Sequence, residues 1–228
     1  MFIRSELKAN AKSNFKRNYW TSVGVCTLPI GISIAIYIFM CVAGVMVGSL
    51  TGETGIGYAI GTAILQMIRL VIVYFVYEII ALGVCSFFIK NRTMSGEVSN
   101  ILDGFKSGNY MNLVKVLFLK DIFISLWSLL FIIPGIVKAY EYRMIPYILA
   151  ENPGMNRKEV FEISKRMMQG KKWETFVLDF SFIGWSLLGS ITCGIAFIFY
   201  VLPYINATYA ELYAFNKQQA YAEGCICK

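Results

Sequence analysis

Among the charged side chains that interrupt otherwise apolar stretches of the sequence, six are the residues best placed to carry chemistry. A charge at the centre of a bilayer costs about 2.5–3.5 kcal/mol on insertion scales, so it is kept where it has a partner or a task. Three interpretations are open: a structural network of ion pairs, a polar path for a substrate or ion, or an acid-catalysed intramembrane reaction. The candidate residues are Arg69, Glu78, Asp121, Glu141, Arg143 and Asp179.

Arg69 and Glu78 cannot pair with each other if they belong to one helix. They are nine residues apart in the sequence, which is about 180° around a helix. Each therefore needs a partner on another segment, and the helix that carries them should be central. We expect Glu78 to meet a basic or hydroxyl group. The leading candidates for the partner of Arg69 are Asp121, Glu141 and Asp179.

The residue types also exclude several kinds of chemistry. The chain has no histidine, which excludes histidine general bases, histidine-liganded zinc or iron, and imidazole pH switches. It contains no Walker-type loop, no Gly-x-Ser-x-Gly elbow and no cluster of metal ligands. The sequence therefore predicts a protein that is not an enzyme and binds no metal or cofactor.

The cysteines are interpreted mainly as small packing residues. Four of them lie in or beside apolar segments, where free thiols usually behave as small hydrophobes. The other two form a Cys-x-Cys near the end of the chain, and two thiolates alone make a poor metal site. Lipidation or metal transfer is the minor alternative there. The first group is Cys26, Cys41, Cys85 and Cys193, and the second is Cys225 and Cys227.

The elements that position these residues follow from the apolar pattern. Hydrophobic residues make up 57% of the chain and charged residues 15%, whereas a soluble domain typically carries about 25% charged residues. Crossing a hydrocarbon core takes about 20 residues of helix. We expect an all-α integral membrane protein with six transmembrane helices arranged as three hairpins, each preceded by a short amphipathic interfacial helix. The apolar segments are 23–50, 58–89, 113–133, 136–150, 175–190 and 195–215.

The distribution of lysine and arginine predicts the orientation. Basic connections face the cytosol, and the alternate connections should lack Lys and Arg. Segments 1–19, 90–112 and 151–172 are basic, whereas 51–57, 134–135 and 190–194 contain neither residue. The first apolar run is far longer than the hydrophobic region of a signal peptide, so it should remain as an anchor. We expect a bacterial plasma membrane protein with both termini in the cytosol.

The chain also repeats itself. The stretch from Asp121 to Leu130 (DIFISLWSLL) matches DFSFIGWSLL from Asp179 in register, and both copies continue to a Pro-Tyr-Ile and then an acid. Repeats of this length indicate copies of one supersecondary unit. The sequence predicts a single membrane domain over 1–216, followed by a polar cytosolic tail over 217–228. The pseudo-repeats are 1–90, 91–151 and 152–216.

The segments that lead into the hairpins are basic and amphipathic. Such helices fit the headgroup region, where each Lys or Arg near anionic lipid contributes about 1 kcal/mol. They either anchor the hairpins or form a docking surface, so the expected partners are the bilayer, anionic headgroups, and a protein partner or second copy. Nucleic acid is not expected, because the membrane already uses these charges. The basic residues are Arg4, Lys8, Lys12, Lys16, Lys165, Arg166, Lys171 and Lys172.

Several motifs resemble one known family. They are IPGIVKAY from Ile133, MIPYILAE from Met144, FVLDFSFIGW from Phe176, and the closing Pro203-Tyr204. Together they are similar to the bacterial membrane family catalogued as domain of unknown function 975. The resemblance covers most of the chain and implies a bacterial plasma membrane protein with several spans. The family has no established activity, so it assigns no catalytic residue.

Two classes of function remain open on this basis. The first is a transport- or export-associated membrane component without its own ATPase, and the second is a membrane scaffold, assembly factor or immunity-type partner. A membrane enzyme is third. An open, polar cavity lined by Arg69, Glu78 and Asp121 would favour transport, and a closed interior would favour the scaffold.

Overall fold

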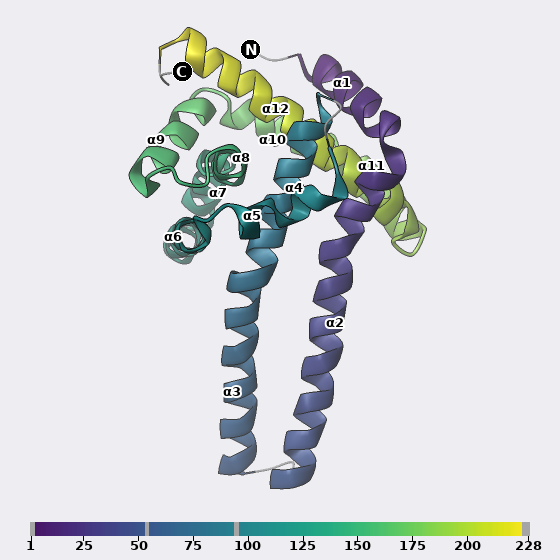
Figure 1. The fold of residues 1–228 in the computed structure, drawn as a ribbon, viewed down its shortest axis with the longest axis vertical. Coiled ribbons are helices and arrows are strands. Elements are labelled where there is room, and N and C mark those ends of the chain that lie inside the picture. The colour runs from purple at the N-terminus through teal and green to yellow at the C-terminus, as the bar shows by residue number, and fades with distance from the viewer. Residues whose placement is uncertain (1–2, 53–54, 94–95, 225–228) are drawn as a thin grey trace.

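The computed structural model describes residues 3–52, 55–93 and 96–224, and all regular structure in these ranges is helical. Figure 1 shows two parts: a stalk made of two long helices side by side, and a head of shorter helices at one end of it. The first helix, α1 (Arg4–Arg17), and the end of the last, α12 (Leu202–Ala222), both lie in the head. The all-α fold is as predicted.

The stalk contains the two elements that are long and apolar enough to cross a membrane. They are α2 (Tyr19–Thr51) and the continuous helical stretch Ile56–Asn91, which comprises α3 (Ile56–Ile72), the π-helical turn η1 (Val73–Tyr77) and α4 (Glu78–Asn91). Beyond the head, residues 30–51 and 56–77 each rise about 33 Å at 1.5 Å per residue. That length matches a hydrocarbon core of about 30 Å.

The other two hairpins are present, but each contains one helix of only about ten residues, α7 or α11. The second pairs α6 (Tyr110–Leu130) with α7 (Ile132–Glu141), and the third pairs α11 (Ile183–Ile191) with η3 (Phe197–Val201). A helix of about ten residues rises only about 15 Å, half the hydrocarbon thickness. In the third hairpin, α10 (Lys172–Phe180) comes directly before α11 in the chain. Six transmembrane helices are therefore not confirmed, because only two candidate spans occur in the described part of the chain.

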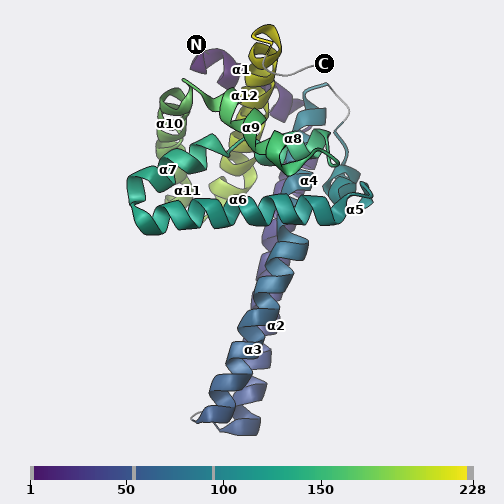
Figure 2. The same ribbon diagram turned by 90° about the vertical axis from the view of Figure 1, so that its left-hand side faces the viewer.

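The apolar pattern did not show where the backbone breaks. The expected fourth segment, 136–150, bends at 142–144 between α7 and α8 (Ile145–Glu151), and the expected fifth, 175–190, breaks at 181–182. The hairpins also point in different directions: α6 lies across the stalk axis in Figure 2, whereas α11 and α12 run obliquely in Figure 1. They radiate from the head and do not form one parallel bundle.

Helices precede all three hairpins, whereas their predicted place at a membrane interface stays a prediction. They are α1, the short pair η2 (Val98–Leu102) and α5 (Asp103–Lys106), and α9 (Arg157–Met168). The apolar face of α1 is buried at Leu7, Ala11 and Phe15 in packing dominated by α12, and α9 packs on α12, α8 and α7. Protein therefore covers the faces that were expected to meet lipid, because the head has its own hydrophobic core.

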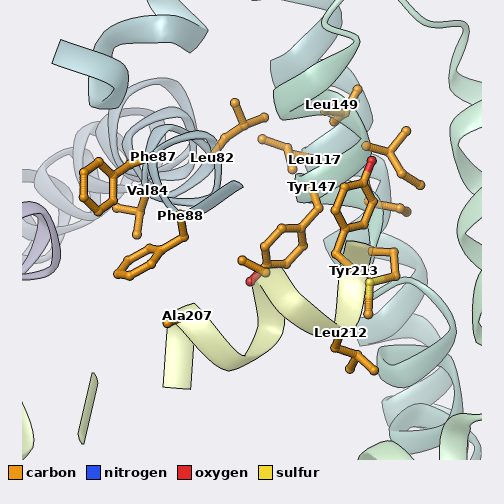
Figure 3. Close-up of a cluster of buried hydrophobic side chains, with 14 of the residues drawn as sticks. Leu82, Val84, Phe87, Phe88, Leu117, Tyr147, Leu149, Ala207, Leu212 and Tyr213 are labelled. Atoms are coloured by element: carbon orange, nitrogen blue, oxygen red, sulfur yellow. The ribbon is translucent and has the colours of Figure 1, made fainter. Parts of the chain in front are cut away.

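That core is built around α4. Figure 3 shows Leu82, Phe87 and Phe88 of α4 with Leu117 of α6, Tyr147 and Leu149 of α8, and Leu212 and Tyr213 of α12. All of these side chains are buried. The second half of α4 thus continues the stalk into the middle of the head and fixes the two parts to each other.

α4 and η2 pack closely against each other at Gly83. An added Cβ there would lie 2.0 Å from the carbonyl oxygen of Ile101 in η2, which is backbone and cannot move aside easily. Gly83→Ala should therefore lower the free energy of unfolding in detergent by about 2 kcal/mol. Gly24→Ala is the matched control, because nothing lies within 4 Å of its added Cβ. Equal melting temperatures for the two variants would contradict this packing.

Candidate functional site

Glu78 has the basic partner that was expected, and the partner is Lys120. The Nζ of Lys120 lies 3.8 Å from Glu78 Oε2 and 3.2 Å from Asp121 Oδ1. Glu78 opens α4 and the other two residues belong to α6, so one ammonium group bridges two acids from different hairpins. Sequence reasoning overlooked Lys120 because it considered only the acid beside it.

Arg143 and Asp179 form the second cluster. Arg143 Nη1 donates to Asp179 Oδ2 at 2.8 Å, and the Tyr140 hydroxyl donates to the same oxygen at 2.7 Å. The Tyr209 hydroxyl donates to Asp179 Oδ1, and the guanidinium lies 4.2 Å from the Tyr209 ring centroid. Burial and the bond to Asp179 raise the pKa of Tyr140 to about 12, which keeps its hydroxyl protonated as a donor. Neither tyrosine was predicted.

Glu141 lies in a separate, buried cluster. Its carboxylate accepts from Lys138 Nζ at 2.9 Å and from Lys172 Nζ at 2.7 Å. Burial alone would raise the pKa of Glu141, but the bonds from Lys172 and Lys138 outweigh it and hold the pKa below its ordinary value. The carboxylate therefore stays ionised between two ammonium groups, and α7 is tied to the start of α10.

Two further acids connect α8 and α12 to other segments of the head. Glu151, at the end of α8, accepts from the Tyr213 hydroxyl at 2.7 Å and from Lys217. Glu211, in α12, accepts from Arg92 Nε at 2.8 Å and from Asn14 Nδ2 at 2.9 Å. The sequence placed these acids at matching repeat positions, but their partners come from distant segments. The repeat itself stays a prediction.

Four of the residues predicted to be membrane-surface cations contact other side chains of the protein. Lys172 pairs with Glu141, Lys8 donates to the Ser181 hydroxyl and lies 4.4 Å from the Phe182 ring centroid, and Lys171 lies 5.7 Å from that of Phe215. Burial lowers the pKa of Lys8, with the nearby Arg4 adding to the effect. Arg166 pairs with Glu162 along α9. Those on the exposed surface are Arg4, Lys12, Lys16, Lys165 and Arg166.

Arg69 lies apart from the other charges. It is exposed on α3 in the stalk and forms no ion pair with any residue in the described ranges. It lines a cavity of about 150 Å³ between α2 and α3. The residues of the predicted polar network therefore lie in separate clusters in the head, apart from Arg69 in the stalk. Among the residues that the structure describes, Arg69 has no carboxylate partner of the kind that was expected.

A further cavity lies in the head. It has a volume of about 660 Å³ and is open at the surface. Its wall includes two ion pairs, Lys90–Asp103 at 2.7 Å and Lys217–Glu151. Burial would raise the pKa of Asp103, but the bonds from Lys90 and the Ser86 hydroxyl hold it below its ordinary value.

The cysteines and metal ligands give no further site. Cys26 is buried, Cys85 is half-buried, and Cys41 and Cys193 are exposed, all as free thiols. Cys225 and Cys227 lie outside the described residues. Within the residues that the structure describes, no group of three or more Cys, Asp or Glu side chains is placed to hold a metal ion.

Comparisons with known proteins give a family but no activity. No curated protein and no solved structure matches the chain. One family model, described as "Protein of unknown function (DUF975)", matches residues 1–142 and 131–219. These two matches span nearly the whole sequence, as the resemblance of the motifs indicated. The chain therefore belongs to the DUF975 family.

Proposed function

We propose that this protein is a membrane-anchored scaffold, in which the stalk crosses the bilayer and the head presents an interaction surface in the cytosol. The observation that carries the proposal is the architecture of the crossing element. Within the residues that the structure describes, two helices form the stalk, and two helices cannot enclose a water-filled path between them (Figure 1). The chain by itself is therefore suited to anchoring and assembly.

The surface of the stalk supports its place in the bilayer. Its apolar side chains are open along its length, with Phe39 64% and Val45 73% exposed on α2 and Met67 63% exposed on α3. Apolar patches on soluble monomers reach only about 300–600 Å². Residues 30–77 contain Arg69 as their only lysine or arginine, so the basic head belongs on the cytosolic side. Both ends of the chain then lie there.

The short hairpins fit the head-side interface of the bilayer. Their exposed residues include Trp127 on α6, Trp173 on α10 and Trp185 on α11, with Trp173 72% exposed. Tryptophan is enriched where a membrane meets water. Because α6 lies across the stalk axis, a bilayer crossed by the stalk would have α6 in its plane (Figure 2). We place these hairpins in the cytosolic leaflet, in preference to the six-span arrangement.

The charges of the head also favour a scaffold over a transporter. Glu78, Asp121 and Asp179 all have partners within the chain. A transport path was expected to bring Arg69, Glu78 and Asp121 to one cavity, but Arg69 lines a cavity in the stalk and the two acids meet Lys120 in the head. Transport stays a prediction that would need a larger assembly.

Reconstitution tests the proposal. The purified chain in vesicles of phosphatidylethanolamine and phosphatidylglycerol should leak potassium, chloride and carboxyfluorescein no faster than empty vesicles. In polymer nanodiscs cut from native membranes, it should co-migrate with other protein subunits in a complex larger than a disc that holds one 25.8 kDa chain. Flux above that of empty vesicles, abolished by Lys120→Leu, would favour transport instead. Migration as a lone monomer would contradict the scaffold.

A further inference from the structure

The geometry of the stalk points to a docking site at Arg69. We propose that the seam between α2 and α3 binds a carboxylate side chain carried by the membrane helix of a different protein. This inference rests on the proposed function, since it names the chemistry by which a scaffold would hold its partner. It is carried by the depth of Arg69, the polar face around it, and the cavity beside it.

Arg69 lies deep within the stalk. It is 13 residues after Ile56, or about 20 Å from the far end of α3, and 8 residues before Tyr77, or about 12 Å from the head. Both distances exceed the length of an extended arginine side chain. An exposed guanidinium in hydrocarbon at that depth is costly, and intramembrane charges normally pair with another group. Within the described residues, this one has no such partner.

The residues around Arg69 form a polar face on α3. At 100° per residue, Tyr58, Thr62, Gln66 and Arg69 fall within about 80° of one another. The Thr62 hydroxyl donates to the Tyr58 carbonyl at 2.9 Å, whereas Gln66 and Arg69 bond to nothing in the described part of the chain. Two strong donors therefore remain open on one face of a helix surrounded by apolar side chains.

The facing side of α2 leaves room at this level. A Cβ added to Gly48 would meet the Tyr58 ring at 3.7 Å, but one added to Gly44 would meet nothing within 4 Å. The helices therefore close near Gly48 and leave a gap one turn nearer the head. Tyr37, Cys41 and Gly44 of α2, together with Thr62, Gln66 and Arg69 of α3, line the cavity of about 150 Å³ there.

The size and charge of the gap identify its occupant. A cavity of about 150 Å³ between two helices has room for one side chain. A guanidinium binds a carboxylate through two parallel hydrogen bonds. A second copy cannot supply the acid at this depth, because Glu53, between α2 and α3, is the only acid in 30–77. A lipid phosphate would sit at the interface, about 12 Å away along the helix.

Model membrane helices provide a direct test. Fluorescent oligoleucine peptides carrying Asp, Asn or Leu at the bilayer midplane are added to vesicles that contain the full-length chain, and association is measured by energy transfer. The Asp peptide should bind the wild-type chain about tenfold more tightly than the Leu peptide. Arg69→Leu should remove this preference, and Arg69→Lys should retain part of it.

A charge reversal keeps the result independent of folding. Arg69→Glu should prefer a peptide with Lys at the midplane over the Asp peptide, which a misfolded chain would not do. Equal binding of the Asp and Leu peptides by the wild type, in vesicles that show no solute flux, would overturn the docking site and leave the scaffold intact. Solute flux through the wild-type chain would overturn the scaffold, whatever the peptides do.

Discussion

A cysteine substituted for Thr51 should react with a membrane-impermeant maleimide on intact cells, whereas one substituted for Thr192 should remain unlabelled until detergent is added. Thr51 ends α2 at the far end of the stalk, and the proposed topology exposes that end outside the cell. Thr192 follows α11 at the tip of the third hairpin, which belongs to the cytosolic leaflet in that topology. Labelling should therefore differ in an all-or-none manner.

The labelling experiment separates two topologies. Six spans would place both positions outside the cell, so equal labelling of Thr51→Cys and Thr192→Cys would restore that arrangement. Lys165→Cys, on the exposed face of α9, is the cytosolic control and should react only after detergent treatment. Its labelling on intact cells would overturn the orientation itself. The background chain has all six native cysteines replaced by serine, which removes competing thiols.

The apolar pattern predicted the stalk because a long apolar helix can be recognised from a run of consecutive residues. Length and hydrophobicity are enough to identify a candidate membrane-spanning helix, and α2 and Ile56–Asn91 have both. The expected segment 136–150 is shorter and more polar, with Lys138, Glu141 and Arg143 inside it. It breaks at 142–144, where Arg143 turns toward Asp179. Such breaks depend on tertiary contacts that composition does not contain.

The sequence predicted that charged residues in apolar segments would be paired, but it identified only some of their partners. A charged residue in an apolar run requires a partner, and Glu78, Asp121 and Asp179 have one. The partners themselves come from the arrangement of the hairpins, so Lys120 and Tyr209 were missed. The same argument predicted an acidic partner for Arg69 within the chain, but no acid among the described residues pairs with it.

The Arg143 cluster should give a large effect on stability. Arg143 lies between α7 and α8, while Asp179 belongs to α10 and Tyr209 to α12. One guanidinium thus joins three segments, and the side chains of Arg143 and Asp179 are only 28% and 23% exposed. Removing one member of a buried pair costs about 3–5 kcal/mol, because the other charge is left uncompensated.

Arg143→Leu should therefore lower the free energy of unfolding in detergent by about 3 kcal/mol, at the low end of that range because water reaches the pair. Adding Asp179→Asn should recover part of the loss, since the stranded carboxylate is then neutral and can still accept from Tyr140 and Tyr209. The matched control is Arg157→Leu, an exposed arginine at the start of α9 that should change stability by less than about 0.5 kcal/mol. Chemical unfolding followed by tryptophan fluorescence measures all three variants. If the double variant is less stable than Arg143→Leu alone, the two side chains do not stabilise each other, and the three segments must be held together by the apolar core around α4.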